Sequence, residues 1–302
     1  MDRTFFIHDS SLLQSESDDP LLAIRSFISP KPMNSGEKCV LCGSLVTLFD
    51  SVTTITGSVP RKITLQNQVF AIARVESQIT LALSCTLESK EDPVALLDML
   101  IEIVQLRFSS FSSLLRFWSE GQISDDLLNI LAHTEKLVPI DNDFEMHMKS
   151  SIFMENCMTN YSHIGSCILF REDIVHSHFD TRTTKLIVAA SYFPNYNSET
   201  GKTELSNLTW FTVFVRKNIF QNIGCFDANT EKNLSLNPEI SDDTDENEHI
   251  SLILACLCVN QSAMLMLCPV GGFSPETTQK LEKELVALDR QLAIKVLLDE
   301  AE

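Results

Sequence analysis

The sequence FFIHDSSLLQSESDDPLLAIRSFISP, residues 5–30, carries the pattern from which the fold can be predicted. Its first residues are apolar on both faces of an extended chain, which predicts a buried central strand over residues 4–8. The polar, acidic residues 10–20 predict a loop. Residues 22–29 alternate well enough for a second strand, which the breaker Pro30-Lys31-Pro32 ends. Two strands joined by an acidic loop therefore open the fold.

A helix and three strands are expected next. Residues 36–49 carry apolar side chains at helical spacing, which predicts an amphipathic helix with a core stripe of Val40, Leu41, Leu45, Leu48 and Phe49. Strands are predicted over residues 63–65, 69–75 and 79–87. Asp92 and Pro93 begin another helix, because Asp caps free amides and Pro lacks the amide that would stay unpaired. A helical stretch over residues 108–118 completes this module.

The same order of elements recurs from about residue 165. Two strands, a short helix, three strands and a closing helix are expected, over residues 166–170, 174–179, 181–191, 208–215, 250–259 and 263–268 and from Ser274-Pro275 onward. Residues 221–249 are acidic and low in hydrophobicity, which predicts a disordered loop. The two copies do not match residue by residue, so the repeat is architectural.

This pattern predicts an α/β (α+β) protein of two domains, each with a mixed five-stranded sheet flanked by helices. The first domain is expected over residues 1–120 and the second over residues 165–302. Residues 121–164 are expected to form a helical bridge and linker, with Ser124 capping a helix that runs to Leu137.

Composition limits the possible functions. The chain has 302 residues, of which 44% are hydrophobic, and a formal net charge of −18. That charge argues against nucleic acid and against direct docking on anionic membranes, since both need clustered Lys and Arg. No signal peptide is visible, and no apolar run reaches the ~18 residues needed to span a bilayer. The nine cysteines lie mostly in apolar stretches such as residues 254–258, which favours buried, reduced thiols in a cytosolic protein.

Few residues suggest chemistry. Cys39-x-x-Cys42 is either half of a zinc site, a redox pair or core packing, and its place on a predicted helix favours packing. His176, His178 and Asp180 share one strand face, where they either touch a metal or are simply solvated. No phosphate-binding glycine loop, hydrolase elbow or paired catalytic carboxylates stand out, so we expect no catalytic, cofactor or metal site and not an enzyme. The acidic run over residues 239–248 either attracts a basic partner or is a solvated loop.

The opening stretch, with LCGSLVTLFDSVTTITGSVPRKITLQNQVFAIARVESQITLALSCTLE over residues 41–88, resembles the first longin domain of a known family. That family is the longin-domain subunit mutated in type-four Hermansky–Pudlak syndrome, part of biogenesis of lysosome-related organelles complex three and related to Ccz. The shared details are an aromatic-rich first strand ending in His8-Asp9-Ser10, the Leu-Cys-Gly at residues 41–43 and the Phe-Ala-Ile at residues 70–72. GSCILFREDIVHSH, residues 165–178, resembles the start of a second longin domain.

The resemblance implies a heterodimer with a second longin-domain protein, similar to the type-one Hermansky–Pudlak subunit. Such dimers resemble the Mon–Ccz complex and promote nucleotide exchange on Rab GTPases. The implied setting is vesicle trafficking in the biogenesis of lysosome-related organelles, with a cytoplasmic protein recruited peripherally to endosomal, lysosomal or lysosome-related membranes. The alternative is a non-catalytic trafficking scaffold or Rab effector. An exchange factor prefers the GDP-bound or empty GTPase, whereas an effector prefers the GTP form.

By the same resemblance, the first domains of both subunits build a platform for the GTPase. The contact surface is then expected on the exposed face of the helix over residues 36–49 and on the loop over residues 58–62. The candidate residues for partner or GTPase contact are Lys38, Ser44, Thr47, Asp50, Arg61 and Lys62. The helix is also expected to expose apolar residues such as Val46 to the partner domain.

Overall fold

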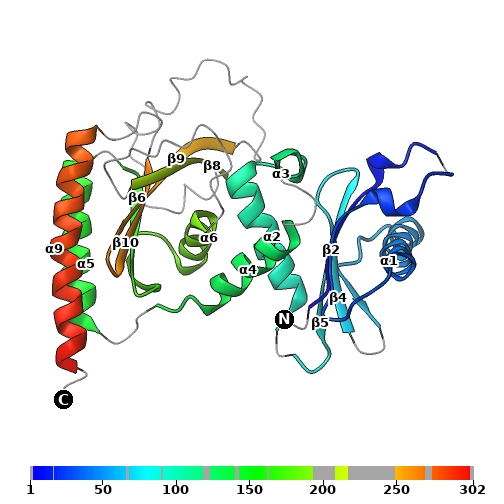
Figure 1. The fold of residues 1–302 in the computed structure, drawn as a ribbon, viewed down its shortest axis with the longest axis horizontal. Helices are drawn as coiled ribbons and strands as arrows, with labels where there is room; N and C mark the ends of the chain where they lie inside the picture. Colours follow the sequence, from blue (N-terminus) through cyan, green and yellow to red (C-terminus); the bar gives the residue numbers. More distant parts are fainter. Residues whose placement is uncertain are drawn as a thin grey trace. The chain divides into compact units, whose positions relative to one another are not determined.

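The computed structural model divides the chain into two compact units, Met1–Ala132 and His133–Glu302. The division falls within helix α4 (Ile123–Lys136). The structure describes residues 3–15, 17–65, 68–89, 91–117, 123–139, 143–161, 163–192, 208–216, 249–268 and 274–299. Each unit is considered by itself (Figure 1).

The first unit is built on a five-stranded sheet of order β2-β1-β5-β4-β3. Its strands are β1 (Phe5–Asp9), β2 (Ile24–Ile28), β3 (Lys62–Thr64), β4 (Gln68–Arg74) and β5 (Ile79–Thr86). Neighbouring strands pair antiparallel throughout, so the expectation of a mixed sheet was wrong in strand direction. The reason is topological: β3, β4 and β5 follow one another as hairpins, and the crossover through the first helix returns the chain to the far edge.

Strand β1 is central and buried on both faces, as its sequence predicted. Phe5, Phe6 and Ile7 have no solvent exposure. Phe6 packs with Phe70 and Ile72 of β4 beneath helix α1 (Ser35–Thr56), while α2 (Pro93–Phe108) contacts β4 and β5. Figure 1 shows α1 and α2 on opposite sides of this sheet. Alternation of side chains along the strands therefore supplies two separate apolar faces.

Helix α1 is longer than predicted. It begins with a capping box, in which Asn34 Oδ1 accepts from the Glu37 amide at 2.9 Å and a Glu37 carboxylate oxygen accepts from the Asn34 amide at 2.8 Å. It continues past Phe49 through a β-branched stretch to Gly57, whose φ of 66° is a left-handed conformation that favours glycine. The Gly57 amide donates to the Thr53 carbonyl at 2.9 Å. The helix thus ends at a glycine cap.

Short helical elements complete the first unit. The acidic loop contains two 3-10 turns, η1 (Ser10–Leu12) and η2 (Pro20–Ala23), where a plain loop was expected. The side chain of Asp92 accepts from the Val94 amide at 3.2 Å and Pro93 opens α2, which confirms the predicted helix start. Helices α3 (Phe111–Phe117) and α4 follow in the chain.

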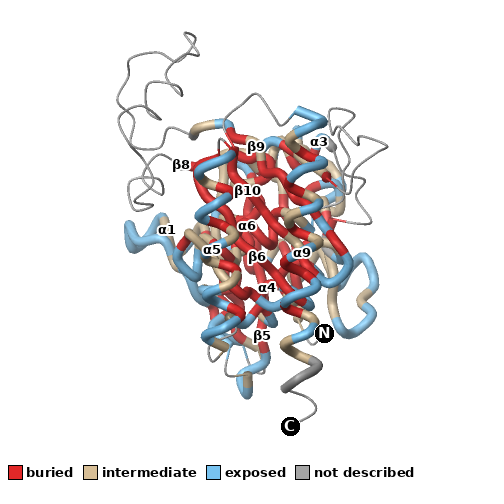
Figure 2. The backbone as a smooth tube through the Cα atoms, turned by 90° about the vertical axis from the view of Figure 1, so that its left-hand side faces the viewer, coloured by how far each residue is buried: buried red, intermediate tan, exposed pale blue. Residues whose placement is uncertain are grey.

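The second unit repeats the strand order, as β7-β6-β10-β9-β8, again antiparallel throughout. Its strands are β6 (Gly165–Phe170), β7 (Asp173–Ser177), β8 (Leu208–Arg216), β9 (His249–Val259) and β10 (Ser262–Cys268). Helix α6 (Thr181–Ser191) follows β7 just as α1 follows β2. Buried residues dominate β6 and β10, shown in red in Figure 2. Two α/β units of one strand order confirm the predicted fold class.

Residues 121–164 are not a separate bridge. Helix α5 (Phe144–Asn160), which the sequence analysis did not predict, contacts β6, β7 and the closing helix α9 (Pro275–Asp299). Met146, Met154 and Cys157 of α5 lie in one core with leucines of α9. Figure 1 shows α5 and α9 together on one side of the sheet and α6 on the other. The second unit therefore begins before residue 165. The loop predicted over residues 221–249 lies outside the described residues, apart from His249 in β9.

Candidate partner-binding surface

The face of α1 toward the sheet differs from the predicted core stripe. The buried residues of α1 are Cys42, Leu45, Val46 and Phe49, which follow the spacing of a helix face that covers a sheet. Val40 and Leu48, expected in the core, are 69% and 43% exposed. Val46, expected to face the partner, is buried. Leu45 and Phe49 of the predicted stripe are confirmed, and Leu41 packs against the same core. Val40 and Leu48 were wrong, because the inner face also follows Cys42 and Val46.

The outer face of α1 carries a line of exposed apolar side chains. Val40, Leu48 and Ile55 are 69%, 43% and 83% exposed, and their spacings of eight and seven residues place them on one side of the helix. The line is about 22 Å long at 1.5 Å per residue. Leu22 is another exposed apolar residue, at 56%, and it lies on η2, which contacts α1. We call Val40, Leu48 and Ile55 the α1 line; the pale blue of exposed residues along α1 is visible in Figure 2.

Helix α1 is unusually apolar for a helix with so much exposed surface. Among the described residues it is the helix whose length and composition would also suit a membrane span, with a mean hydropathy of 1.6 over an 18-residue window of which 17% is buried. This differs from the expectation that no stretch would qualify. A helix that packs on the sheet of a folded domain passes the same test, and α1 packs in that way through Cys42, Leu45 and Phe49.

The predicted polar residues of α1 border the α1 line. Ser44 and Thr47 are exposed, whereas Lys38 and Asp50 are half-buried. The Lys38 ammonium lies 5.3 Å from the centre of the Phe27 ring. An Asp50 carboxylate oxygen lies 2.7 Å from a guanidinium nitrogen of Arg74. Lys38 and Asp50 therefore anchor α1 to β2 and β4, and Ser44 and Thr47 remain on the outer surface.

The two predicted basic residues lie at the start of β3, an edge strand of the sheet. The Arg61 guanidinium pairs with the Asp98 carboxylate of α2, and the Arg61 carbonyl accepts from the Ile72 amide at 3.1 Å. Lys62 is exposed and lies opposite Ala71 in the ladder. Four of the six candidates thus lie on α1 and Lys62 lies on the edge strand β3. Arg61 directly precedes β3 and also pairs with α2.

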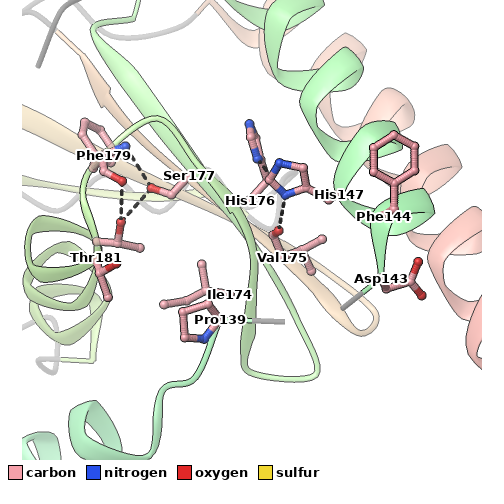
Figure 3. A pocket seen from close by; sticks show the side chains of 11 residues that line it. Pro139, Asp143, Phe144, His147, Ile174, Val175, His176, Ser177, Phe179 and Thr181 are labelled. Carbon is pink, nitrogen blue, oxygen red and sulfur yellow. Dashed lines mark hydrogen bonds between the residues drawn. The ribbon is translucent and has the colours of Figure 1, made fainter. Parts of the chain in front are cut away.

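A second feature of interest is a surface cavity of about 490 Å³ in the second unit. It is lined by the start of α5, by β7 and by the start of α6 (Figure 3). His147 of α5 and His176 of β7 bring their Nδ1 atoms to 3.2 Å. His147 Nδ1 also lies 3.3 Å from the Val175 carbonyl oxygen, its acceptor in the tautomer with a proton on Nδ1. The same proton faces His176, whose Nδ1 then acts as an acceptor.

Burial, His147 and His178 lower the pKa of His176 to about 4. Burial also lowers the pKa of His178, an effect that nearby Glu155 opposes. The His176 imidazole is therefore neutral at pH 7. Asp180 does not join them: its oxygens cap α6 by accepting from the Thr183 amide at 3.0 Å and from the Thr183 hydroxyl at 2.6 Å. Within the described residues, no group of three or more His, Cys, Asp or Glu is placed to hold a metal.

The cysteine pair Cys39 and Cys42 lies on α1, one turn apart. Cys42 is buried in the core under the helix, and burial raises its pKa to about 12. Burial also raises the pKa of Cys39. The protonated Cys42 thiol under the helix fits core packing, the interpretation that the sequence favoured, whereas Cys39 is only half-buried.

The sequence analysis missed two features of these surfaces. Ile55, the most exposed apolar residue of α1, lay beyond the predicted end of the helix; the glycine at residue 57 is the signal that would have extended it. The proximity of His147 to His176 has no signal in the sequence, because the two residues lie on separate elements, α5 and β7.

The first unit is a five-stranded antiparallel sheet between α1 and α2, with an apolar helix face left exposed. Residues 3–119 match the family described as the first longin domain of INTU, CCZ1 and HPS4. The first unit is thus a first longin domain of that family, which confirms the resemblance carried by residues 5–30 and 41–88. A comparison with curated proteins found no match to the chain.

Proposed function

We propose that the chain is one subunit of a heterodimeric guanine-nucleotide exchange factor for Rab GTPases, acting in the biogenesis of lysosome-related organelles. The match of residues 3–119 to the first longin domain of INTU, CCZ1 and HPS4 supports a role in trafficking. The observation that carries the proposal is the α1 line, a row of large apolar side chains exposed on an otherwise well-packed domain. Such rows mark surfaces that bind another protein.

The partner in this proposal is a second longin-domain protein similar to the type-one Hermansky–Pudlak subunit. The α1 line supplies the apolar centre of the interface, and the exposed hydroxyls of Ser44 and Thr47 supply polar contacts at its border. The GTPase then contacts the rim formed by Lys38, Asp50 and the basic start of β3 at Arg61 and Lys62. Lys38 and Asp50 lie on α1 itself, and Asp50 forms an ion pair with Arg74 of β4.

Exchange of this kind makes no covalent bond and uses no cofactor. The binding energy of the dimer stabilises a GTPase whose switch loops are displaced and whose nucleotide site is empty. The chain acts as a regulatory subunit and not as an enzyme with its own catalytic group. We place it in the cytoplasm and on endosomal, lysosomal or lysosome-related membranes through its partners, since a net charge of −18 opposes direct binding to anionic lipid.

The test is release of fluorescent mant-GDP from a panel of Rab GTPases by the purified heterodimer. Acceleration by the dimer, and not by either subunit alone, supports the proposal. The alternative is a scaffold or effector: binding restricted to the GTP form of a Rab, with unchanged GDP release, would establish that reading in place of exchange.

The structure selects the rim variant for this assay. Asp50→Lys would bring a positive charge against Arg74, and Arg61→Glu would bring a negative charge against Asp98, so both would disturb the first unit itself. Lys62→Glu reverses an exposed charge on an edge strand without either problem. We expect slower GDP release with the heterodimer intact on gel filtration. An unchanged release rate would remove the start of β3 from the GTPase site.

A further inference from the structure

Two cysteines of the second unit form a close thiol pair. Cys256 and Cys258 lie two residues apart on β9, so their side chains project from the same face of the sheet, and their sulfurs are 3.6 Å apart. Ala255, Leu257 and Val259 project from the other face into the core beneath α5 and α9. The pair therefore lies on the face of the sheet that α6 contacts.

The two thiols have different surroundings. Cys256 is buried, 9% exposed, with Thr209 of β8 opposite it in the ladder. Cys258 is exposed, and in the described ladder the preceding residue of β9, Leu257, lies opposite Leu208. On the β10 side Cys258 lies opposite Ala263. Tyr192, which follows α6, lies close enough to both cysteines for them to raise its pKa, and Cys167 acts on Cys256 from β6. The sequence analysis expected residues 254–258 to hold buried thiols, which is wrong for Cys258.

The difference between the two thiols favours Cys258 as the nucleophile. Either thiol can donate the hydrogen bond between the two sulfurs. When Cys258 is a thiolate, Cys256 is the donor, which lowers the pKa of Cys258 to about 7. The same hydrogen bond and burial raise the pKa of Cys256 far above its usual range. An exposed sulfur that is about half thiolate at pH 7, beside a protonated donor, is the arrangement found in reactive cysteines.

We propose that Cys258 is a site of thiol–disulfide exchange with small disulfides of the glutathione type, and that Cys256 is its positioning residue. The Cys258 thiolate attacks one sulfur of glutathione disulfide and forms a new S–S bond. The original S–S bond breaks, and one glutathione leaves as a thiolate that takes a proton from water. The products are one mixed disulfide on Cys258 and one reduced glutathione.

Exchange stops at the mixed disulfide. Residues two apart on a strand have Cα atoms about 6.6–6.8 Å apart, at the upper limit for a disulfide. Closing the bond between Cys256 and Cys258 would require β9 to shorten, while its ladder with β10 runs the full length from Ser262↔Val259 to Cys268↔Ile253. The raised pKa of Cys256 further slows its attack on the mixed disulfide.

The experiment treats the full chain with glutathione disulfide between pH 6 and pH 10 and follows the adduct by mass spectrometry. We expect one adduct, located at Cys258 by peptide fragmentation, with a rate that rises around pH 7. Cys258→Ser should abolish the adduct. Cys39→Ser, which alters a half-buried thiol in the first unit, is the matched control and should leave the adduct unchanged.

Replacing the neighbour gives the sharper test. Cys256→Ala removes the donor, so the pKa of Cys258 returns toward about 8.5 and the rate profile moves up by more than one pH unit. At pH 7 the rate should fall only about threefold, because a more basic thiolate is also a better nucleophile. Above pH 9 the variant should exceed the wild type. Cys256→Ser keeps a hydroxyl donor and should restore the profile near pH 7.

The opposite results overturn the proposal. An adduct elsewhere, including on Cys225 outside the described residues, would exclude Cys258 as the reactive thiol. A product that has lost two hydrogens and carries no glutathione would show that an internal disulfide forms. A pH profile unchanged by Cys256→Ala would remove Cys256 from the site.

Discussion

Replacing one residue of the α1 line tests the assembly most directly. Ile55 is 83% exposed at the end of α1, so it contributes little to the folded first unit. Burying a complete isoleucine side chain at an interface is worth about 1.5–3 kcal/mol. Ile55→Ser therefore removes about 2 kcal/mol of interface energy, which raises the dissociation constant about 30-fold. The stability of the chain alone should change by less than about 0.5 kcal/mol.

The assay is titration of the longin-domain partner by isothermal calorimetry, with urea unfolding of the free chain measured in parallel. Leu87→Ser is the matched control, because Leu87 is 51% exposed but follows β5 and lies outside α1. The control should bind as the wild type does. The reasoning is refuted if Ile55→Ser binds with unchanged affinity, or if both variants weaken binding equally.

Three predictions concern the second unit. Asp289→Ala should lower the free energy of unfolding, measured in urea, by about 2–4 kcal/mol. The buried Asp289 carboxylate accepts hydrogen bonds from Asn260, Gln261 and Ser262 at 2.8–3.2 Å and so holds the β9–β10 turn on α9. A loss below about 1 kcal/mol would contradict that role. Gly165→Ala should lower the free energy of unfolding by about 1–3 kcal/mol, because the added Cβ would lie 2.6 Å from the buried Phe179 ring. An unchanged melting temperature would show that the ring moves freely. Stability should fall from pH 7 to pH 5.5, because the lowered pKa of His176 means that the native state binds fewer protons than the unfolded chain between pH 6.5 and about pH 4. His176 alone contributes at most about 1.4 kcal/mol of folding free energy per pH unit. His176→Asn should therefore flatten the slope of stability against pH. An equal slope in the variant would exclude His176 as the cause.

Local sequence patterns predicted most elements of both units. The strand over residues 4–8, the helix start at Asp92-Pro93 and the helix over residues 181–191 depend on neighbouring residues alone, through apolar runs and helix caps. The repeated strand order followed from the order of those elements. The match over residues 3–119 confirms the resemblance that the same stretches carried.

Helix faces were harder to predict. The residues of α1 are apolar nearly all round, so periodicity could not decide which side meets the sheet. The sheet decides it, since Phe6, Phe70 and Ile72 present the surface that Cys42, Leu45 and Phe49 cover. Helix α5 was missed for a related reason: its sequence is only weakly amphipathic, and its burial depends on α9, more than a hundred residues away.

The sequence by itself determined that this protein has two α/β units of one element order, and that the first resembles a longin domain, because turns, caps and alternating apolar residues act over short distances. Only the tertiary structure decided which side chains meet. It left Val40, Leu48 and Ile55 uncovered, brought His147 to His176, and exposed Cys258 while burying Cys256. These outcomes depend on where separate elements pack, such as α5 against β7 and α6 against β9, and no local pattern records that.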